Sequence, residues 1–497
     1  MKRKLLAFGM AGLVVLLVAS VCLAEIEFSV GGHFRARSYW ITNPDLKEGG
    51  PERSYTDQRL ILDPVLKLSD AIQVKARIRA LDYIWGRNTV PGLTWPEMIG
   101  WDDDKLATTA AGQGEAGTNN FQFDRAWVHV FLGKYGSVQI GRQKTDLFHN
   151  FSIAEDDTYP RYHYITPVFD LGNDRAIMFG ILYDKRTEGG NDAITESSII
   201  EFGDDEIQGT ADDDDVNEDG KITKYTAEDS FAWCPWFFFM SPKLTIGYVF
   251  FVWDWAGKGP AGESSNWIMH DAMINAKLGP VDIKSEIDYL HGRWIASWDE
   301  VKHSLEFFVD ASVPIETSPY LDRASVVFGL FSGTKPPEDG VHFGSIGSNE
   351  DWVEEWKIDL ILWDQIFNSI YNAYIIRPKI DFVIPDTRWG GFLSACFSFA
   401  DQEAGYYYEE YELDAPDYWV TGEKPDSEWT WRNPHPVDLT QGDEKSIGTE
   451  LDLGINYTLG PRQTIELVLG IFMPGKYFAE DNRDTSFGAA LKTHIRF

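Results

Sequence analysis

The feature that most constrains the fold is an alternation of apolar and polar residues with a period of two, repeated in many segments of this chain. In the last segment, 487–497, apolar residues and Thr493 fill the odd positions, whereas the even positions include Lys492 and Arg496. Successive side chains of a strand point to opposite faces, so one face of each segment suits lipid and the other suits water. A tilted strand crosses a bilayer with about 9–11 residues, which matches these segments. The same alternation occurs at 72–80, 281–289, 305–313 and 447–459.

The connections between these segments alternate in length. Short turns are expected at 69–71, 133–136, 241–243, 279–280 and 460–462. Long polar stretches are expected at 41–57, 83–120, 145–173, 203–228, 333–368 and 401–445. Transmembrane barrels have short periplasmic turns and longer extracellular loops, whereas a soluble sandwich does not need this asymmetry. The chain is therefore predicted to be an all-β protein, a transmembrane antiparallel β-barrel of about 18 strands. This count includes a strand near 195–202, and both termini are expected on the periplasmic side.

The N-terminus has the three parts of a secretory signal. Residues 2–4 are basic, 5–21 form an almost continuous apolar run, and 22–24 offer small residues for cleavage. The alternatives are a transmembrane anchor, for which the run is short, and a lipoprotein site at Cys22, where the preceding residue is bulky. The prediction is a signal peptide at 1–24 and a barrel domain at 25–497, located in the outer membrane of a Gram-negative bacterium.

The composition limits the class of protein further. Aromatic residues make up 14% of the chain, and no long apolar segment follows the signal peptide, which is typical of barrels with aromatic girdles. The net charge of −34 excludes binding of nucleic acid through a global positive field. No histidine is spaced from a serine or cysteine as in a known catalytic motif, so an enzyme is not predicted. Nothing in the sequence pairs Cys234 with Cys396.

The final residue, Phe497, closes the apolar face of the last segment. A chain that ends on a strand with a terminal Phe resembles the C-terminal signal of outer-membrane barrels. This resemblance implies that the barrel assembly machinery reads Phe497. Outer-membrane lipid and lipopolysaccharide are the other expected partners.

Charged residues at the polar, alternate positions of each strand are expected to line the interior. A charge that faces lipid costs about 2–4 kcal/mol at the middle of the bilayer. In a closed barrel the first and last strands are neighbours. A contiguous basic wall is therefore predicted from Arg35, Arg37, Lys75, Arg77, Arg79, Lys492 and Arg496. The acidic counter-charges that the pattern places lie on the opposite wall, at Asp271, Asp282, Glu286, Asp288, Glu306 and Asp310. The basic wall is interpreted as a track for anions, and the alternative is charges that pair and seal the barrel.

Two blocks of sequence resemble the alginate export family of outer-membrane porins. The C-terminal block runs from Gly448 to Tyr457 and from Gly470 to Tyr477, and the early block comprises 124–127 and 141–143. The resemblance implies an 18-stranded barrel with an arginine-rich conduit for an acidic polysaccharide, in which Arg125 and Arg142 line the conduit.

The acidic stretch 203–230 contains the front of a calcium loop. Asp215, Asn217 and Asp219 occupy the first, third and fifth positions, and Gly220 follows them as the turn residue. Lys221 would offer its backbone carbonyl. The twelfth position holds Thr226 instead of the usual Glu. The prediction is an extracellular Ca²⁺ site, and the alternative is a solvated acidic loop.

The function predicted from these features is an outer-membrane, porin-like channel for hydrophilic anionic solutes or an acidic polysaccharide. The alternative is a surface adhesin or a scaffold barrel without significant transport.

Overall fold

The computed structural model describes most of the barrel but not the signal region or the longest connections. The described residues are 26–47, 49–50, 52–84, 121–143, 159–187, 230–255, 265–293, 302–332, 358–366, 370, 372–401 and 444–497. The expected signal peptide at 1–24 and the calcium loop at 215–221 lie outside this part of the chain. Among the described residues, no helix is long and apolar enough to cross a membrane.

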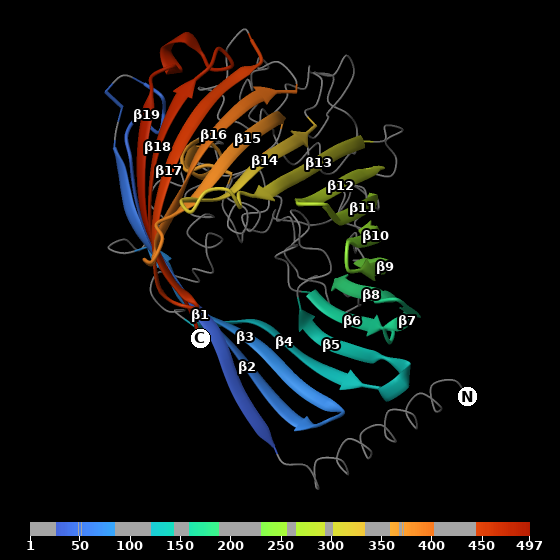
Figure 1. Ribbon diagram of the computed structural model, residues 1–497. Coiled ribbons are helices and arrows are strands. Elements are labelled where there is room, and N and C mark those ends of the chain that lie inside the picture. Colours follow the sequence, from blue (N-terminus) through green and yellow to red (C-terminus); the bar gives the residue numbers. More distant parts are fainter. Residues whose placement is uncertain are drawn as a thin grey trace, which may run out of the picture.

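The described chain forms one antiparallel sheet that closes on itself (Figure 1). The first part comprises β1 (Glu27–Ile41), β2 (Arg53–Ser69), β3 (Ile72–Ile84), β4 (Phe121–Phe131), β5 (Ser137–Gln143), β6 (Tyr159–Ile165), β7 (Phe169–Gly172), β8 (Arg175–Thr187), β9 (Ser230–Ser241) and β10 (Leu244–Trp255). The second part comprises β11 (Ser265–Leu278), β12 (Val281–Arg293), β13 (Lys302–Pro314), β14 (Leu321–Phe331), β15 (Ala373–Val383), β16 (Trp389–Ala400), β17 (Ser446–Gly460), β18 (Gln463–Pro474) and β19 (Ser486–Arg496).

Closure is made by β1, which pairs with β2 on one side and with β19 on the other. Because β6 and β7 both pair with β8, they are two parts of one strand, and the barrel has 18 positions around its wall. The predicted fold class is therefore confirmed. The strand expected near 195–202 lies outside the described residues, and β8 pairs directly with β9 without it.

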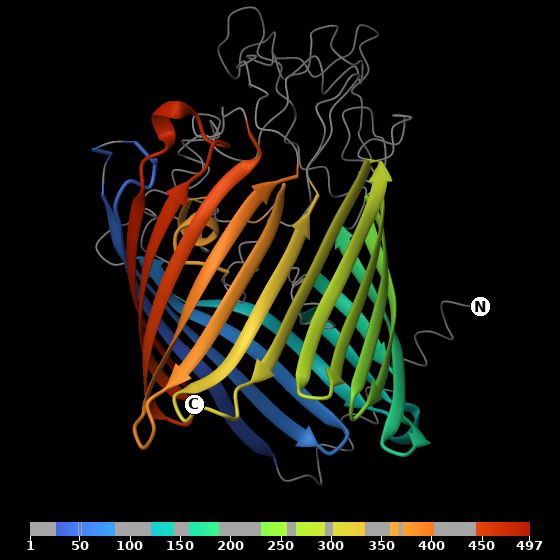
Figure 2. The same cartoon turned by 45° about the horizontal axis from the view of Figure 1, so that its top comes forward.

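The connections have the predicted asymmetry. Because consecutive strands are antiparallel, all the short turns fall at one end of the barrel (Figure 2), and the strand ends that the long connections join lie at the other end. The stretch 145–173, expected to be a loop, contains β6 and β7. The outward positions of β6 are Tyr162 and Tyr164, whose hydroxyls make this strand look polar in the sequence.

The outward face of the barrel is apolar. Large apolar side chains such as Phe123, Leu393 and Phe487 are at least half exposed, with exposed fractions of 58%, 57% and 50%. Exposed aromatic residues next to the short turns include Tyr135, Phe169, Tyr320 and Trp389. A ring of aromatic residues at a strand end is typical of the membrane interface, so the outward face is the lipid-facing surface of a membrane-spanning barrel.

Three histidines interrupt this apolar surface on β11, β12 and β13. His291 lies directly opposite His303, and His270 lies opposite Tyr289. The hydroxyls of Tyr248 and Tyr289 form hydrogen bonds with Nδ1 of His270 and of His303, at 2.8 and 2.6 Å. His291 and His303 are close to the strand ends that carry the long connections, so these polar rings belong to the interfacial zone.

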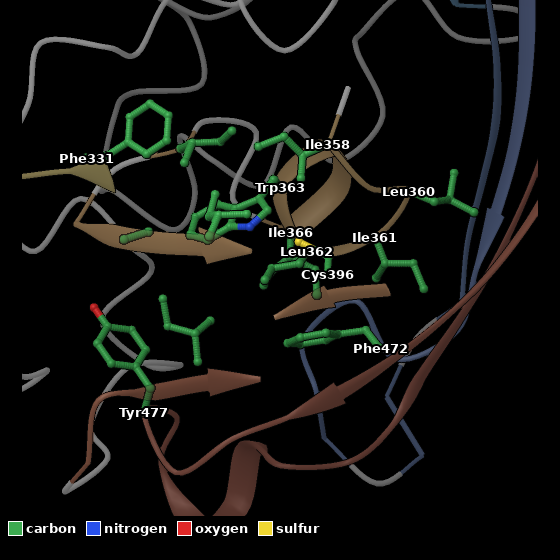
Figure 3. Packing of buried hydrophobic residues seen from close by; sticks show 14 of the residues in the cluster. Phe331, Ile358, Leu360, Ile361, Leu362, Trp363, Ile366, Cys396, Phe472 and Tyr477 are labelled. Atoms are coloured by element: carbon green, nitrogen blue, oxygen red, sulfur yellow. The ribbon is translucent and has the colours of Figure 1, made fainter. Parts of the chain in front are cut away.

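The largest buried apolar cluster lies inside the barrel. Residues 358–366 and Ile370, in the connection between β14 and β15, lie inward and include a short π-helix at Leu362–Ile366 (Figure 3). Leu360, Ile361 and Trp363 are at most 1% exposed and pack with inward side chains of β14 to β19 and β1. The prediction that the whole stretch 333–368 lies outside the barrel is therefore wrong. We call residues 358–366 together with Ile370 the inward loop.

Cys234 on β9 and Cys396 on β16 are both buried.

Phe497 completes the closure of the barrel. Its N–H donates to the carbonyl of Gly32 at 3.0 Å, and the Gly32 N–H donates to its carbonyl at 3.1 Å. The side chain is 50% exposed on the lipid-facing surface.

We expect that deleting Phe497 leaves the protein in the periplasm, which fractionation and heat-modifiable mobility in gels will show. Phe497→Ala keeps both backbone bonds and removes only the ring, and Phe497→Tyr keeps an aromatic ring. If Phe497→Ala inserts as well as the wild type, the ring is not an assembly signal.

Candidate functional site

The exposed apolar side chains show which parity of each strand faces lipid, and the other parity faces the interior. On β1, Phe28, Val30 and Trp40 are exposed, so the odd-numbered residues of this strand line the interior. Directly paired residues of neighbouring strands share a face. The register therefore extends this assignment from β1 around the barrel.

A basic wall covers β1 to β4 and β19. Arg35 and Arg37 lie opposite His494 and Lys492 of β19, and Arg35 lies opposite Arg59 of β2. On β3 and β4, Arg77 lies opposite Arg125. We define the basic wall as the inward residues Arg35, Arg37, Arg59, Lys75, Arg77, Arg79, Arg125, Lys492 and Arg496.

Two aspartates of β2 lie within this wall. The Nε atom of Arg37 donates to both oxygens of Asp57 at 3.0 Å, and Nη2 lies 2.6 Å from Oδ2. Arg77 donates to Asp63 from Nε at 2.7 Å and from Nη2 at 3.2 Å. Paired donors of this kind are the strong, oriented form of the arginine–carboxylate contact.

A third aspartate, Asp124, lies at a bulge between β3 and β4. Its carboxylate is 3.5 Å from Nη2 of Arg79 and 3.4 Å from Nε of Arg125. The expectation that the counter-charges lie on the opposite wall is therefore wrong for these arginines. Even so, the cations of the basic wall outnumber these three aspartates.

Arg142 does not lie where the family resemblance places it. It pairs with Ala126, on the outward parity of β4, and it is exposed. Side chains of a strand alternate between its two faces. Gln139 pairs with the inward His129, so the odd-numbered residues of β5 face the interior and Arg142 faces outward. The register therefore excludes Arg142 from the inner face.

A second basic group, which the sequence analysis missed, lines β14 and β15. Arg323 lies opposite Asp381, and Lys379 is 2.7 Å from the same carboxylate. Arg377 donates to the Ser394 hydroxyl at 3.4 Å. The spacing of Arg377, Lys379 and Asp381 at every second position was the available signal. Pro378 between them obscured it, because proline is uncommon within strands.

The acidic wall lies across the barrel on β11, β12 and β13. Asp271 lies opposite Asp288, and Asp288 lies opposite Glu306, so three carboxylates form a row across three strands. Glu286 is on the same inner face, beside Asp288. These four residues are at most 9% exposed.

The inward loop is held by Glu450 of β17. One oxygen accepts the N–H groups of Leu360 and Ile361 at 2.8 and 2.7 Å, and the other accepts that of Leu362 at 2.8 Å. These are orphan amides at the start of the helical turn, so a carboxylate is the natural acceptor.

Two glycines make room for the loop. A Cβ atom on Gly470 would lie 3.2 Å from Leu360, and one on Gly488 would lie 2.9 Å from Ile361. Gly470 and Gly488 face each other on β18 and β19, so together they form a recess in the inner wall. The Trp363 indole N–H also donates to the Ser398 hydroxyl at 3.1 Å.

Burial raises the pKa of Asp359 in the inward loop, and the neighbouring Asp452 carboxylate raises it further. The N–H of Trp363 donates to Asp359 at 2.9 Å and partly offsets this rise. The loop thus adds a readily protonated group to the interior.

A completely buried ion pair joins β6 to β8. Arg161 and Asp184 lie directly opposite each other, and Nε is 2.7 Å from Oδ1, with both side chains 0% exposed. Removing one partner of such a pair leaves a buried charge and costs about 3–5 kcal/mol. We expect Asp184→Ala to lower the urea midpoint of unfolding in lipid vesicles strongly.

Two variants serve as controls for Asp184→Ala. Asp170→Asn, at an exposed position of β7, is expected to leave the midpoint nearly unchanged. The double variant Arg161→Met with Asp184→Leu removes both charges and is expected to recover much of the lost stability. An unchanged midpoint in Asp184→Ala would show that the pair does not stabilise the barrel.

Comparisons with known proteins gave no family profile and no curated sequence that matches. Among solved structures, the anion-selective porin from Comamonas acidovorans shares 10% identity at a TM-score of 0.40, over 95% of this chain and 100% of that chain. OpdK from Pseudomonas aeruginosa shares 10% identity at a TM-score of 0.44, over 94% of this chain and 98% of that chain. OmpF from Salmonella typhi shares 8% identity at a TM-score of 0.37, over 95% and 97%. Likeness at this level carries no argument about function.

Proposed function

We propose that this protein is an outer-membrane channel for hydrophilic anionic solutes. The observation that carries the proposal is the basic wall, which is continuous across the seam where β1 meets β19. Barrels of 16–18 strands are wide enough for an aqueous channel, whereas narrow ones are filled by side chains. Arginine and lysine at the lining of a pore favour anions.

The separation of the two walls supports this selectivity. In the strand order, β11 and β12 lie about half a turn of the barrel away from β2 and β3. Salt in a water-filled interior would screen the field between the two walls over a Debye length, about 8 Å at physiological salt. A solute at the basic wall therefore experiences mainly that wall. The inward loop narrows the interior beside it, because it packs on β16 to β19.

The finer proposal is that an acidic polysaccharide is among the solutes. Lys75, Arg77 and Arg79 repeat at every second residue, with Arg35 and Arg37 two strands away. Alternate residues of a strand are about 6.6 Å apart, so the wall offers a row of cations. A row of cations suits a polymer with regularly spaced carboxylates. The resemblance of the early and C-terminal blocks to the alginate export family favours the same class.

The test is reconstitution of the mature chain in planar bilayers under a KCl gradient. We expect discrete conductance steps with a reversal potential on the anion side, and block by a polyuronate but not by neutral dextran. Absence of conductance from a correctly folded barrel would favour an adhesin or scaffold. A cation-selective wild type would contradict the anion proposal, and anion selectivity without polyuronate block would contradict only the polysaccharide.

Calcium binding at Asp215, Asn217, Asp219 and Lys221 remains a proposal, because these residues lie outside the described part of the chain. Asp215→Ala with Asp219→Ala is expected to make the 203–230 region more sensitive to protease only when calcium is present. Equal resistance of the wild type with calcium and with a chelator would contradict the site.

A further inference from the structure

The acidic wall contains a compact group of three buried carboxylates. Asp271 of β11 and Glu286 and Asp288 of β12 each offer an oxygen, and these oxygens lie within 4.8 Å of one another. Their exposed fractions are 0%, 2% and 8%. Three carboxylates this close and this buried repel one another strongly unless protons or a cation neutralise them.

Asp271 shows that the described protein groups do not complete this cluster. Neither of its carboxylate oxygens accepts a hydrogen bond from a described N–H or O–H group. On β10 and β11 its inward neighbours are apolar: Val249 lies opposite it on β10, and Met269 and Met273 flank it on β11. A buried carboxylate without a hydrogen-bond donor is energetically costly. The Asp271 oxygens therefore need a ligand that the described protein groups do not supply.

The spacing of the oxygens matches a single coordination sphere. Ca²⁺ binds six to eight oxygens at about 2.3–2.6 Å, so two oxygens on opposite sides of the ion are about 4.6–5.2 Å apart. All three oxygens of the cluster fall within that span. A donor set of carboxylates alone suits hard cations such as Ca²⁺, Mg²⁺ and Mn²⁺.

We propose that Asp271, Glu286 and Asp288 bind a divalent cation, with Ca²⁺ the best fit, on the inner wall of the barrel. Glu306, directly opposite Asp288, lies next to this site. Water completes the coordination from the interior. The ion offsets two of the negative charges of the acidic wall, which increases the share of the basic wall in the field inside the barrel. The binding itself does not depend on the proposed function as a channel.

The probe is Tb³⁺, which replaces Ca²⁺ and emits when a nearby tryptophan is excited. Trp236 pairs with Val249, which in turn pairs with Asp271, so the indole lies two strands from the site. Two strand spacings are about 10 Å, within range for sensitised emission. The titration uses the folded full-length barrel carrying Asp215→Ala and Asp219→Ala, which removes the other candidate calcium site.

We expect saturable emission that Ca²⁺ displaces. Asp271→Asn with Asp288→Asn is expected to weaken Tb³⁺ binding by at least about tenfold, because affinity follows the ligand charge. Asp310→Asn is the matched control, since Asp310 lies on the same wall and outside the cluster, and it is expected to bind as before. If the double variant does not fold, Glu286→Gln replaces it.

Three outcomes overturn the proposal. One is a folded parent protein that shows no saturable, Ca²⁺-displaced emission, as expected if Asp271 and Asp288 instead share a proton. Another is equal affinity in the cluster variants and the parent. The third is a loss of binding in Asp310→Asn as large as that in the cluster variants.

Discussion

Replacing Glu450 with alanine is expected to release the inward loop from the barrel wall. Glu450 accepts three backbone N–H groups, from Leu360, Ile361 and Leu362. A typical hydrogen bond contributes about 0.5–1.5 kcal/mol. The apolar side chains of the loop remain able to pack. We therefore expect the free energy of docking the loop on the barrel wall to become less favourable by about 3 kcal/mol. This lowers the equilibrium constant for docking about a hundredfold.

Hydrogen exchange measures this change directly. In Glu450→Ala the amides of residues 360–362 are expected to exchange about a hundredfold faster, while the strands keep their protection. If the barrel is a channel, its conductance should also rise and become noisier, because the loop narrows the interior. Glu450→Gln keeps part of the acceptor set and should give an intermediate effect.

Glu466→Ala is the matched control for this variant. Glu466 is an inward acid on the neighbouring strand β18, opposite Lys492 and away from the loop amides. It is expected to leave exchange at 360–362 unchanged. Equal protection of these amides in Glu450→Ala and the wild type would show that apolar packing alone holds the loop.

Removing three charges from the basic wall is expected to abolish most of the proposed preference for anions. The triple variant is Arg35→Gln, Arg59→Gln and Lys75→Gln. Arg35 and Arg59 face each other directly, so their removal also relieves like-charge repulsion and keeps the Arg37–Asp57 and Arg77–Asp63 pairs. A unit charge at about 4 Å in water contributes about 1 kcal/mol. That corresponds to about a fivefold change in local ion concentration, so the anion preference should fall by at least about fivefold.

The control removes the same number of charges elsewhere. Lys134, Lys243 and Lys277 are exposed residues at the end with the short turns, and their replacement by glutamine is expected to change the reversal potential little. Reversal potentials under the same KCl gradient compare the two variants with the wild type. Equal selectivity in the wall variant and the wild type would show that the acidic loops, not the basic wall, govern permeation.

The sequence alone was sufficient for the fold class and for the orientation of most strands. Alternation is local, because successive side chains of a strand always point to opposite faces. It therefore predicts that Arg35, Lys75 and Lys492 lie inward, whichever strand lies next to them. Barrel closure then makes β1 and β19 neighbours, as the register between Arg37 and Lys492 shows.

Only the tertiary structure decided which charges meet and where the longest connections go. The pairing of the wall arginines with Asp57, Asp63 and Asp124 depends on the register between strands and on a bulge. The alternation along a single strand predicts neither of these. Arg142 lies outward, in line with the alternation along β5, whereas the family resemblance implied that it lines the conduit. The inward loop is held by Glu450, about 90 positions along the chain, over a recess made by Gly470 and Gly488. A local pattern reports which face a residue occupies, whereas these contacts join distant parts of the chain that only the closed barrel brings together.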